Sequence, residues 1–281
     1  MKILSFGEIL WDVYPDNAYI GGAPLNFGAH LAKQGAEVYM LSAVGKDELG
    51  SKALSVLEGW GIRTDYVKTL DCETGKCLVT LDENSVPSYN LISDVAWDFI
   101  DGDVNEAFDV LYFGTLALRS QTNLNTVKRL LAKGGFKEVF VDVNIRPPFY
   151  SAKTVSMALE NATILKISDE ELETVVASVG LEVNGTEETA RAIARTYDNI
   201  KIIIITLGAK GSLAYDVKND KFFYAHGIKV EVASTVGAGD SFSASFLRKY
   251  LEGESIDECL AYATKISAFV VSKYDAVPDY E

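Results

Sequence analysis

Cysteine and histidine are scarce in this chain of 281 residues, which has three cysteines and two histidines. Three cysteines are too few for a disulfide framework, and the pair Cys72 and Cys77 has no second pair or nearby histidine to complete a zinc site. We therefore predict that Cys72, Cys77 and Cys259 are buried or free thiols.

Basic residues are also in deficit, because 26 Lys and Arg against 40 Asp and Glu give a formal net charge of −14. No cluster of basic residues offsets this balance. An acidic surface repels the phosphate backbone of nucleic acids and anionic lipid. The composition predicts a protein that binds neither nucleic acid nor membrane, so that any anionic ligand must be held by a local arrangement of the chain.

Long apolar runs are missing as well. No stretch approaches the ~18 apolar residues of a membrane-spanning helix. The first residues, MKILSFGEILWDV, are interrupted by Glu8, and no small-residue cleavage site follows them. We expect a cytoplasmic protein.

What the chain does contain is a globular composition, 48% hydrophobic and 23% charged. Its length is compatible with one large α/β domain, and no Pro-, Gly- or Ser-rich linker divides it. We predict a single domain over residues 1–281.

Short apolar runs alternate with amphipathic segments along the chain. Several runs are almost entirely apolar, as in a parallel sheet covered on both faces, and the predicted strands are Ile3–Ile9, Val38–Val44, Val110–Phe113, Val139–Val143, Ile164–Ile167 and Ile202–Thr206. Apolar residues spaced by three and four predict the helices Pro24–Gln34, Glu48–Gly59, Thr122–Lys133, Asp169–Ser178, Glu187–Tyr197, Asp240–Leu251 and Ile256–Lys273. This alternation predicts a doubly wound, mostly parallel α/β sheet flanked by helices.

One region, Tyr66–Leu91, breaks the alternation. Its segments YVKTL, KCLVTLD and SYNLI are separated by the turn-like ETG and ENSVP, with no room for a helix. The pattern predicts a small antiparallel insertion, paired with the stretch around Val13–Ile20. A lid over a cleft and a plain edge hairpin are both compatible with it.

The most informative motif is STVGAGDSF, residues 234–242, which precedes an apolar-periodic segment. Gly237 and Gly239 at the start of a helix allow a tight bend and leave N–H groups free to bind an anion. Asp240 falls in the first turn of that helix, although an ordinary helix cap is the alternative interpretation. Phe242 replaces the third glycine of GxGxxG, and no GxxxxGK[ST] occurs, so both of those nucleotide motifs are disfavoured.

Polar or glycine-rich turns follow several other predicted strands. Asp12 follows the first strand, GGAPLN opens the first helix, and DVNIRPP, KISDEE and TLGAKG follow later strands. Open α/β sheets bind ligands at the carboxyl ends of their strands, so these turns are expected to share one cleft. Within it, Asp12 and Asn26 suit the paired donors and acceptors of a polyol.

These motifs together resemble the ribokinase-like (PfkB) family of carbohydrate kinases. GGAPLNFGAHLAKQGAEVYMLSAVGKDELG is similar to the amino-terminal signature of that family, and STVGAGDSFSASFL is similar to its carboxy-terminal one. The segments DVNIRP, KISDEE and TLGAKGS follow the order of the family. GEILWDV, GGAPLN, FGTLALRS and DVNIRPPFY most resemble bacterial fructokinases.

The resemblance implies a ribokinase-like fold with a small β-sheet lid, formed by segments around residues 12–20 and 66–96. It implies that sugar lies beneath the lid, that ATP lies across the carboxyl edge of the sheet, and that a homodimer can form through the lid. The implied roles are a catalytic base at Asp240; an anion hole at Gly237, Ala238 and Gly239; a sugar side with Asp12, Gly22, Asn26 and Arg146; a nucleotide side with Thr206, Gly208, Gly211 and Thr264; and a link to Mg²⁺, through water, at Glu171.

Three positions depart from the family pattern. Ser234 stands where Asp is usual, near a monovalent-cation site of several members, and Asp275 replaces the glycine of a carboxy-terminal SxxGA pattern. Both departures put K⁺ activation in doubt. Ser168 replaces the Asn of the NxxE motif, which leaves the surroundings of Mg²⁺ less defined.

The expected activity is transfer of the γ-phosphoryl group of ATP, with Mg²⁺, to a sugar hydroxyl, with D-fructose as the first candidate. The alternatives are a kinase of the same family acting on ribose, a ketodeoxy sugar acid or a nucleoside, or a non-catalytic relative that senses sugar or nucleotide. A nicotinamide oxidoreductase is disfavoured by the missing third glycine.

Overall fold

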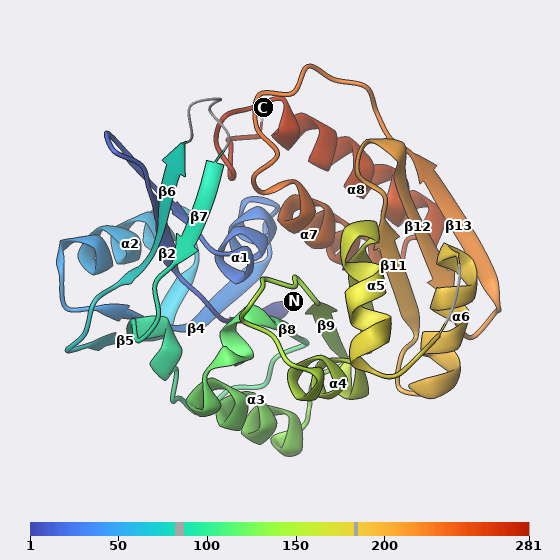
Figure 1. Cartoon of the computed structure of the whole chain (residues 1–281), viewed down its shortest axis with the longest axis horizontal. Helices are drawn as coiled ribbons and strands as arrows, with labels where there is room; N and C mark the ends of the chain where they lie inside the picture. Colours follow the sequence, from blue (N-terminus) through green and yellow to red (C-terminus); the bar gives the residue numbers. More distant parts are fainter. Residues whose placement is uncertain (82–86, 183–184, 281) are drawn as a thin grey trace.

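The central element of the fold is a nine-stranded sheet (Figure 1), in a computed structural model that describes residues 1–81, 87–182 and 185–280. Its strands are β1 (Lys2–Phe6), β4 (Glu37–Gly45), β5 (Arg63–Leu70), β8 (Val110–Gly114), β9 (Glu138–Asp142), β10 (Ile164–Ser168), β11 (Ile202–Thr206), β12 (Gly211–Asp216) and β13 (Lys221–His226). They are ordered β13-β12-β11-β10-β9-β8-β1-β4-β5, and every pair from β11 to β5 is parallel. The predicted doubly wound, mostly parallel sheet is confirmed.

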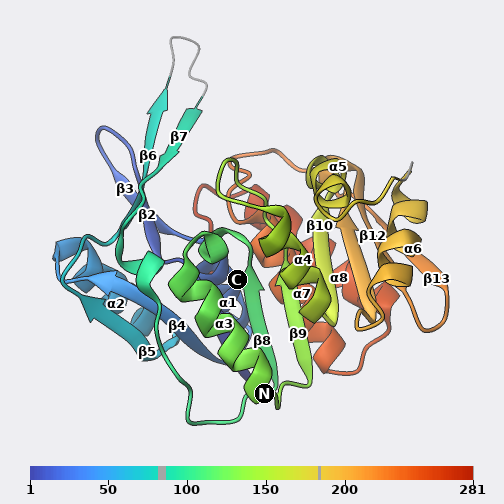
Figure 2. The same cartoon turned by 60° about the horizontal axis from the view of Figure 1, so that its bottom comes forward.

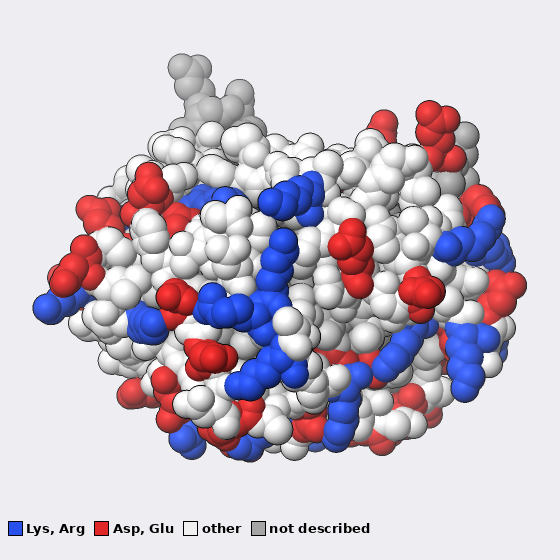
Figure 3. Space-filling view, turned by 90° about the horizontal axis from the view of Figure 1, so that it is seen from below, with Lys and Arg blue, Asp and Glu red and all other residues white. Residues whose placement is uncertain are grey.

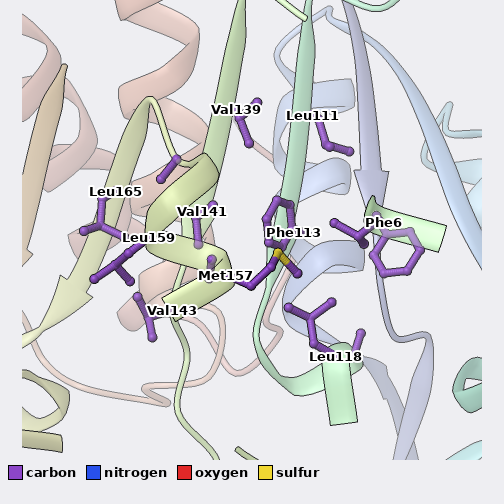
Figure 4. Close-up of a cluster of buried hydrophobic side chains, with 14 of the residues drawn as sticks. Phe6, Leu111, Phe113, Leu118, Val139, Val141, Val143, Met157, Leu159 and Leu165 are labelled. Atoms are coloured by element: carbon purple, nitrogen blue, oxygen red, sulfur yellow. The ribbon is translucent and has the colours of Figure 1, made fainter. Parts of the chain in front are cut away.

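Helices cover both faces of this sheet because its strands are apolar on both sides. The helices are α1 (Ala23–Lys33), α2 (Glu48–Gly59), α3 (Gln121–Lys133), α4 (Ala152–Asn161), α5 (Asp169–Ser178), α6 (Thr186–Thr196), α7 (Ala238–Leu251) and α8 (Ile256–Val271). Ile203 and Ile205 of β11 face the core shared with α3 to α6, whereas Ile202 and Ile204 face the core shared with α1, α2, α7 and α8. Figure 2 shows α3 and α4 in front of the sheet and α7 and α8 behind it. Figure 4 shows part of the first core, where Phe113 and Val141 pack near Met157 of α4.

A second, four-stranded sheet stands away from the first (Figure 2). It consists of β2 (Leu10–Val13), β3 (Ala18–Gly21), β6 (Gly75–Leu81) and β7 (Pro87–Leu91), in the order β3-β2-β6-β7. The predicted pairing of the insertion with the stretch around residues 13–20 is confirmed, since β2 pairs with β6. That central pair is parallel, with Asp12 opposite Cys77, so the expectation of an antiparallel insertion holds only for the two outer pairs.

The insertion also begins later than predicted. The segment 66–70 belongs to β5, the edge strand of the large sheet, where Tyr66 lies opposite Leu41 of the parallel strand β4. An edge strand is partly exposed on both sides, so its sequence alternates like that of a half-buried antiparallel strand. For this reason the pattern could not distinguish the two locations.

Three elements were not predicted from the sequence. Helix α4 follows the proline-rich loop after β9, and the only strong indication of a helix in its sequence is the N-cap residue Ser151. In the structure, Ser151 Oγ accepts a hydrogen bond of 3.2 Å from the N–H of Thr154. Strands β12 and β13 extend the sheet in antiparallel order beyond β11. Their residues are a mixture of apolar, aromatic and charged types, which no single period describes.

The carboxy-terminal residues 276–280 pack across α1, and Ala276 lies beside Gly237 at the start of α7. His30 of α1 is buried, with Nε2 3.0 Å from the carbonyl oxygen of Ala276 and Nδ1 2.5 Å from the hydroxyl of Tyr280. Because the carbonyl can only accept, Nε2 carries the proton and the tyrosine donates to Nδ1. Burial lowers the pKa of His30 to about 4, so the ring is neutral at pH 7.

The three cysteines are free thiols, as predicted. Cys77 and Cys259 are buried and Cys72 is half-buried. Burial raises the pKa of Cys77 to about 11 and that of Cys259 to about 12, so both thiols stay protonated at neutral pH.

The charged residues lie mostly outside these cores. The face drawn in Figure 3 carries Lys and Arg side chains interspersed with Asp and Glu. Among the residues described, no helix is both long and apolar enough to cross a membrane.

Candidate active site

The predicted site residues gather at the carboxyl edge of the large sheet. Strand β1 has β4 on one side and β8 on the other, so the order of the strands reverses between β1 and β8. A crevice at such a reversal is where open α/β sheets bind ligands. Glu8 follows β1, Arg146 follows β9, and the first turn of α7 carries Asp240 to the same place.

The first turn of α7 depends on a glycine. Gly237 is its N-cap, with φ 80°, and a Cβ atom there would lie 2.4 Å from the carbonyl oxygen of Ala276. Only glycine tolerates both the left-handed backbone and this close approach. The N–H of Ala238 already donates to the carbonyl of Thr235 at 3.3 Å, so within the predicted anion hole the N–H of Ala238 is partly engaged.

Asp240 is half-buried and held by a residue from the other end of the chain. Asn26 of α1 donates a hydrogen bond of 2.8 Å from Nδ2 to Oδ2 of Asp240. Burial raises the pKa of Asp240 to about 7 and the charge of Asp142 adds to it, although Asn26, Lys166 and Arg146 act in the opposite direction. A carboxyl group with this pKa can accept a proton at neutral pH.

The residues predicted on the sugar side are brought together. Asp12 on β2 is half-buried, and burial raises its pKa although a hydrogen bond with the Cys77 thiol and the charge of Arg146 lower it. The charge of the exposed Arg146 also lowers the pKa of Glu8 and of Asp240. Its guanidinium therefore lies within electrostatic range of three carboxyl groups that come from different elements.

The residues predicted on the nucleotide side lie farther along the same edge. Thr206 ends β11 opposite Ser168 of β10, and the turn that follows closes with a hydrogen bond of 2.8 Å from Leu207 N–H to the carbonyl of Gly211. Gly208 lies inside that turn. A surface cavity of about 590 Å³ adjoins the turn, lined by residues 185–188 and by Arg191, Leu207, Leu213 and Tyr224.

The fourth nucleotide-side residue, Thr264, comes from α8. Its hydroxyl is buried and has no hydrogen-bond partner within the described part of the chain. The side chain of Asp240 is held by Asn26 and by none of these four residues. Thr206, Gly208 and Gly211 therefore lie along the edge of the sheet, whereas Thr264 is placed by α8.

Glu171, which the resemblance links to Mg²⁺ through water, makes hydrogen bonds with both of its carboxylate oxygens within the protein. Its Oε1 accepts a hydrogen bond of 2.6 Å from the N–H of Ile145, and its Oε2 accepts from Ser168 N at 2.9 Å and Ser168 Oγ at 2.8 Å. Both oxygens are thus engaged at the start of α5. In the described ranges, no group of three His, Cys, Asp or Glu side chains is arranged to hold a metal ion. These contacts fit a role for Glu171 through water.

The structure adds a charged pair that sequence reasoning missed. Lys166 of β10 and Asp142 of β9 are both buried, and Lys166 Nζ lies 2.9 Å from each carboxylate oxygen of Asp142. Ser243 of α7 donates a further bond of 3.1 Å to Asp142. Burial disfavours the ammonium, but Asp142 and Glu171 outweigh it and raise the pKa of Lys166, so the ammonium keeps its charge.

This pair lies beneath the glycine turn of α7. A Cβ atom at Gly239 would be 3.4 Å from Lys166 Nζ. The sequence contains a signal for this pair, because β10 (ILKIS) contains a lysine and β9 (EVFVD) ends in an aspartate. Charged residues rarely occupy central strands without a partner, so each of the two indicates the other. Glu8, which is also buried, was missed in the same way.

Three comparisons with known proteins find similar sequences and structures. The family model described as pfkB family carbohydrate kinase matches residues 13–281. The 5-dehydro-2-deoxygluconokinase of Halalkalibacterium halodurans is 28% identical over an alignment of 300 positions, which covers 100% of this chain and 89% of that protein.

Solved structures are similar over almost the whole chain. A crystal structure of an uncharacterized sugar kinase from Pyrococcus horikoshii in complex with ATP is 25% identical, with a TM-score of 0.82 and coverage of 98% of this chain and 94% of that one. The fructokinase of Vibrio cholerae O395, in its form with fructose, ADP and calcium ion, is 23% identical, with a TM-score of 0.84 and coverage of 98% and 94%. The predicted ribokinase-like architecture is confirmed.

The buried pair of Lys166 and Asp142 generates a test of stability. Lys166→Met leaves a carboxylate buried without its partner, which is expected to lower the free energy of unfolding by about 3–5 kcal/mol. The double variant Lys166→Met/Asp142→Asn has no charge at either position and keeps the bond from Ser243, so it should recover most of that loss. Urea denaturation of wild type and both variants measures this. A single variant as stable as wild type would contradict the coupling of the two charges.

Proposed function

We propose a specific reaction for this chain, which belongs to the pfkB family of carbohydrate kinases: it transfers the γ-phosphoryl group of ATP to a hydroxyl of D-fructose. The observation that carries the proposal is Asp240, a carboxyl group with a pKa raised to about 7 at the mouth of the glycine turn of α7. The fructokinase-like motifs, and the structural similarity to a fructokinase that binds fructose and ADP, support the choice of sugar. We assign the reaction to the cytoplasm, where ATP is available.

In the proposed mechanism Asp240 is the general base. Held by Asn26, its carboxylate accepts the proton of the attacking sugar hydroxyl. Phosphoryl transfer requires mainly positioning and charge stabilisation, which the first turn of α7 supplies through the N–H groups of residues 237–239.

The partial positive charge of the N-terminus of α7 suits an anionic substrate in a chain with net charge −14. Lys166, balanced by Asp142, keeps its ammonium beneath the same turn. Glu171 would hold the Mg²⁺ of the ATP substrate through water, and the ion would supply positive charge to the phosphate groups.

We further propose that the four-stranded sheet is the lid of a single domain. Its strand β2 continues almost directly from β1 and carries Asp12, the residue proposed to bind sugar hydroxyls. Closure of this sheet over the sugar would exclude water and so limit hydrolysis of ATP. The nucleotide would occupy the turn after β11, with Thr206, Gly208, Gly211 and Thr264 around it.

A ketodeoxy sugar acid is the second candidate substrate. Arg146 is exposed, and although its carbonyl accepts from the N–H of Phe149, its guanidinium has no hydrogen-bond partner within the described residues. A guanidinium of this kind suits a carboxylate. The similarity to a 5-dehydro-2-deoxygluconokinase favours the same class of acceptor. Fructose, which has no carboxylate, would leave Arg146 to pair with the nearby carboxyl groups.

An assay of ADP release tests the reaction itself. With ATP and Mg²⁺, D-fructose is expected to give the largest kcat/KM in a panel that also contains ribose, 5-dehydro-2-deoxygluconate and adenosine, and EDTA should abolish the activity. A preference for the acid would select the second candidate. No stimulation by any acceptor would overturn the enzymatic proposal in favour of a sensing role.

Substitution of the proposed base gives a second test. Asp240→Asn keeps the size and capping ability of the side chain but cannot accept a proton, so kcat is expected to fall by about 10²–10⁴ while the melting temperature stays close to wild type. Because the base must be deprotonated, wild-type kcat/KM should rise with pH and level off above about 7. A folded variant that keeps more than about a tenth of wild-type kcat would remove Asp240 from this role.

We also propose that the lid is the contact surface of a homodimer. Three large side chains on the four-stranded sheet are strongly exposed: Tyr19 by 54%, Tyr89 by 57% and Leu78 by 38%. Tyr19 and Tyr89 lie on the face of the sheet that carries Asp12 and Cys77, and Leu78 lies on the other face. The small sheet therefore exposes apolar side chains on both of its faces, which is typical of an interaction surface. A second copy of the chain is the partner that matches this surface symmetrically.

Sedimentation velocity measures this association. Wild type is expected to sediment as a dimer, and Leu78→Asp/Tyr89→Asp as a monomer, because charge on both faces of a symmetric contact is repulsive. The matched control is Tyr224→Asp, which changes another exposed aromatic (51%) that lies on β13 and should leave the dimer intact. A monomeric wild type would refute the dimer.

A further inference from the structure

Glu8 is a buried carboxyl group that the mechanism above does not use. It lies between β1 and β2 and is 2% exposed. Its Oε1 accepts a hydrogen bond of 3.2 Å from the N–H of Ala23, whereas its Oε2 has no partner among the residues that the structure describes. Burial of a carboxyl group is unfavourable, so a position of this kind calls for a specific function.

The beginning of α1 depends on this carboxyl group. Gly22 is the N-cap of the helix and has no side chain to cap it. A larger residue is not tolerated, since φ is 118° and a Cβ atom would lie 2.4 Å from the carbonyl oxygen of Glu8. Glu8 therefore supplies, from the turn between β1 and β2, an acceptor for the N–H of Ala23, one of the N–H groups at the start of α1 that have no partner within the helix.

The same helix turn carries the residue that holds Asp240. The N–H of Asn26 donates to the carbonyl of Gly22 at 2.9 Å, and its side-chain Nδ2 donates to Asp240 at 2.8 Å. Asn26 is only 3% exposed, so it has little freedom to adjust independently of the helix. A shift of the first turn of α1 would move the carboxylate of Asp240.

Charged and titratable groups from three other elements face Glu8. They are Asp240 of α7, Arg146 after β9, and the hydroxyl of Tyr112 on β8. Burial raises the pKa of Glu8 to about 7, Asp240 raises it further, and Arg146 lowers it. Glutamine at this position would keep the acceptor for Ala23 but remove the charge, which allows capping and charge to be tested separately.

We propose that Glu8 is a positioning residue of the phosphoryl transfer: it caps α1, and so fixes Asn26 and the carboxylate of Asp240. This inference rests on the proposed function of Asp240 as the base. The path runs from the end of β1 through Glu8, Ala23 and Asn26 to α7. It ties the reacting carboxylate to the buried strand β1 of the large sheet.

Four variants test the proposal by steady-state kinetics of the full chain at pH 8. Glu8→Ala is expected to lower kcat about tenfold to a hundredfold, with KM for sugar and ATP changed by less than about threefold, because small misplacement of a reacting group has effects of this size. Ala23→Pro removes the N–H donor at a helix position that accepts proline, and should have the same effect. Glu8→Gln should keep kcat within about threefold of wild type.

Gln34→Ala is the matched control. Gln34 follows α1 and donates a bond of 3.2 Å to Ser245 of α7, so its loss weakens the same helix pair at the opposite end. Its kcat is expected within about twofold of wild type. The proposal is overturned if Glu8→Ala and Ala23→Pro lose only thermal stability and keep kcat, or if Glu8→Gln is as slow as Glu8→Ala.

Hydrogen exchange separates this inference from the proposed reaction. In Glu8→Ala, the amides of residues 25–27 and 237–241 should exchange at least about tenfold faster than in wild type. If Glu8→Ala does not fold, the same measurement is made on Ala23→Pro. Exchange of these amides should be unchanged in Glu8→Gln and Gln34→Ala. If wild type phosphorylates no acceptor, the proposed function fails, and the exchange rates alone decide whether Glu8 positions α1 and Asp240. Equal exchange in all variants overturns the inference.

Discussion

The hydrogen bond between Asn26 and Asp240 is the contact on which the candidate site depends, and it joins residues 214 positions apart. It can form only because α1 and α7 pack on the same face of the sheet, where Phe27 and Phe246 belong to one buried core. The carboxy-terminal segment strengthens this arrangement, since Ala276 contacts both His30 of α1 and the region of Gly237.

Electrostatics impose a second constraint on this edge of the sheet. Several carboxyl groups meet there in a chain that is already acidic, and each raises the proton affinity of its neighbours. Lys166, paired with Asp142 beneath α7, and Arg146, exposed above the edge, are positive charges that offset them. The helix N-terminus adds partial positive charge without any basic residue. An anion-binding site is therefore compatible with a net charge of −14.

The differences between prediction and structure have local causes. The segment that contains Tyr66 was assigned to the wrong sheet because an exposed edge strand and an antiparallel strand share one alternating pattern. For Glu171, which the resemblance links to Mg²⁺ through water, the structure adds two partners: Ile145 in the loop after β9 and Ser168 at the N-cap of its own helix. The Ser168 contact is the local capping pattern S-x-x-E, whereas the Ile145 contact joins residues 26 positions apart and cannot be read from the order of residues alone.

The sequence by itself determined the class of fold, the glycine turn before Asp240 and the clustering of polar turns at one edge of the sheet, because periodicity and strand ends are local properties. It also carried the family resemblance, which the match over residues 13–281 bears out. Tertiary structure decided which partners those residues have: Asn26 for Asp240, Lys166 for Asp142, and the start of α1 for Glu8. Burial and long-range pairing set the charge and orientation of these groups, and both arise only when distant segments pack together.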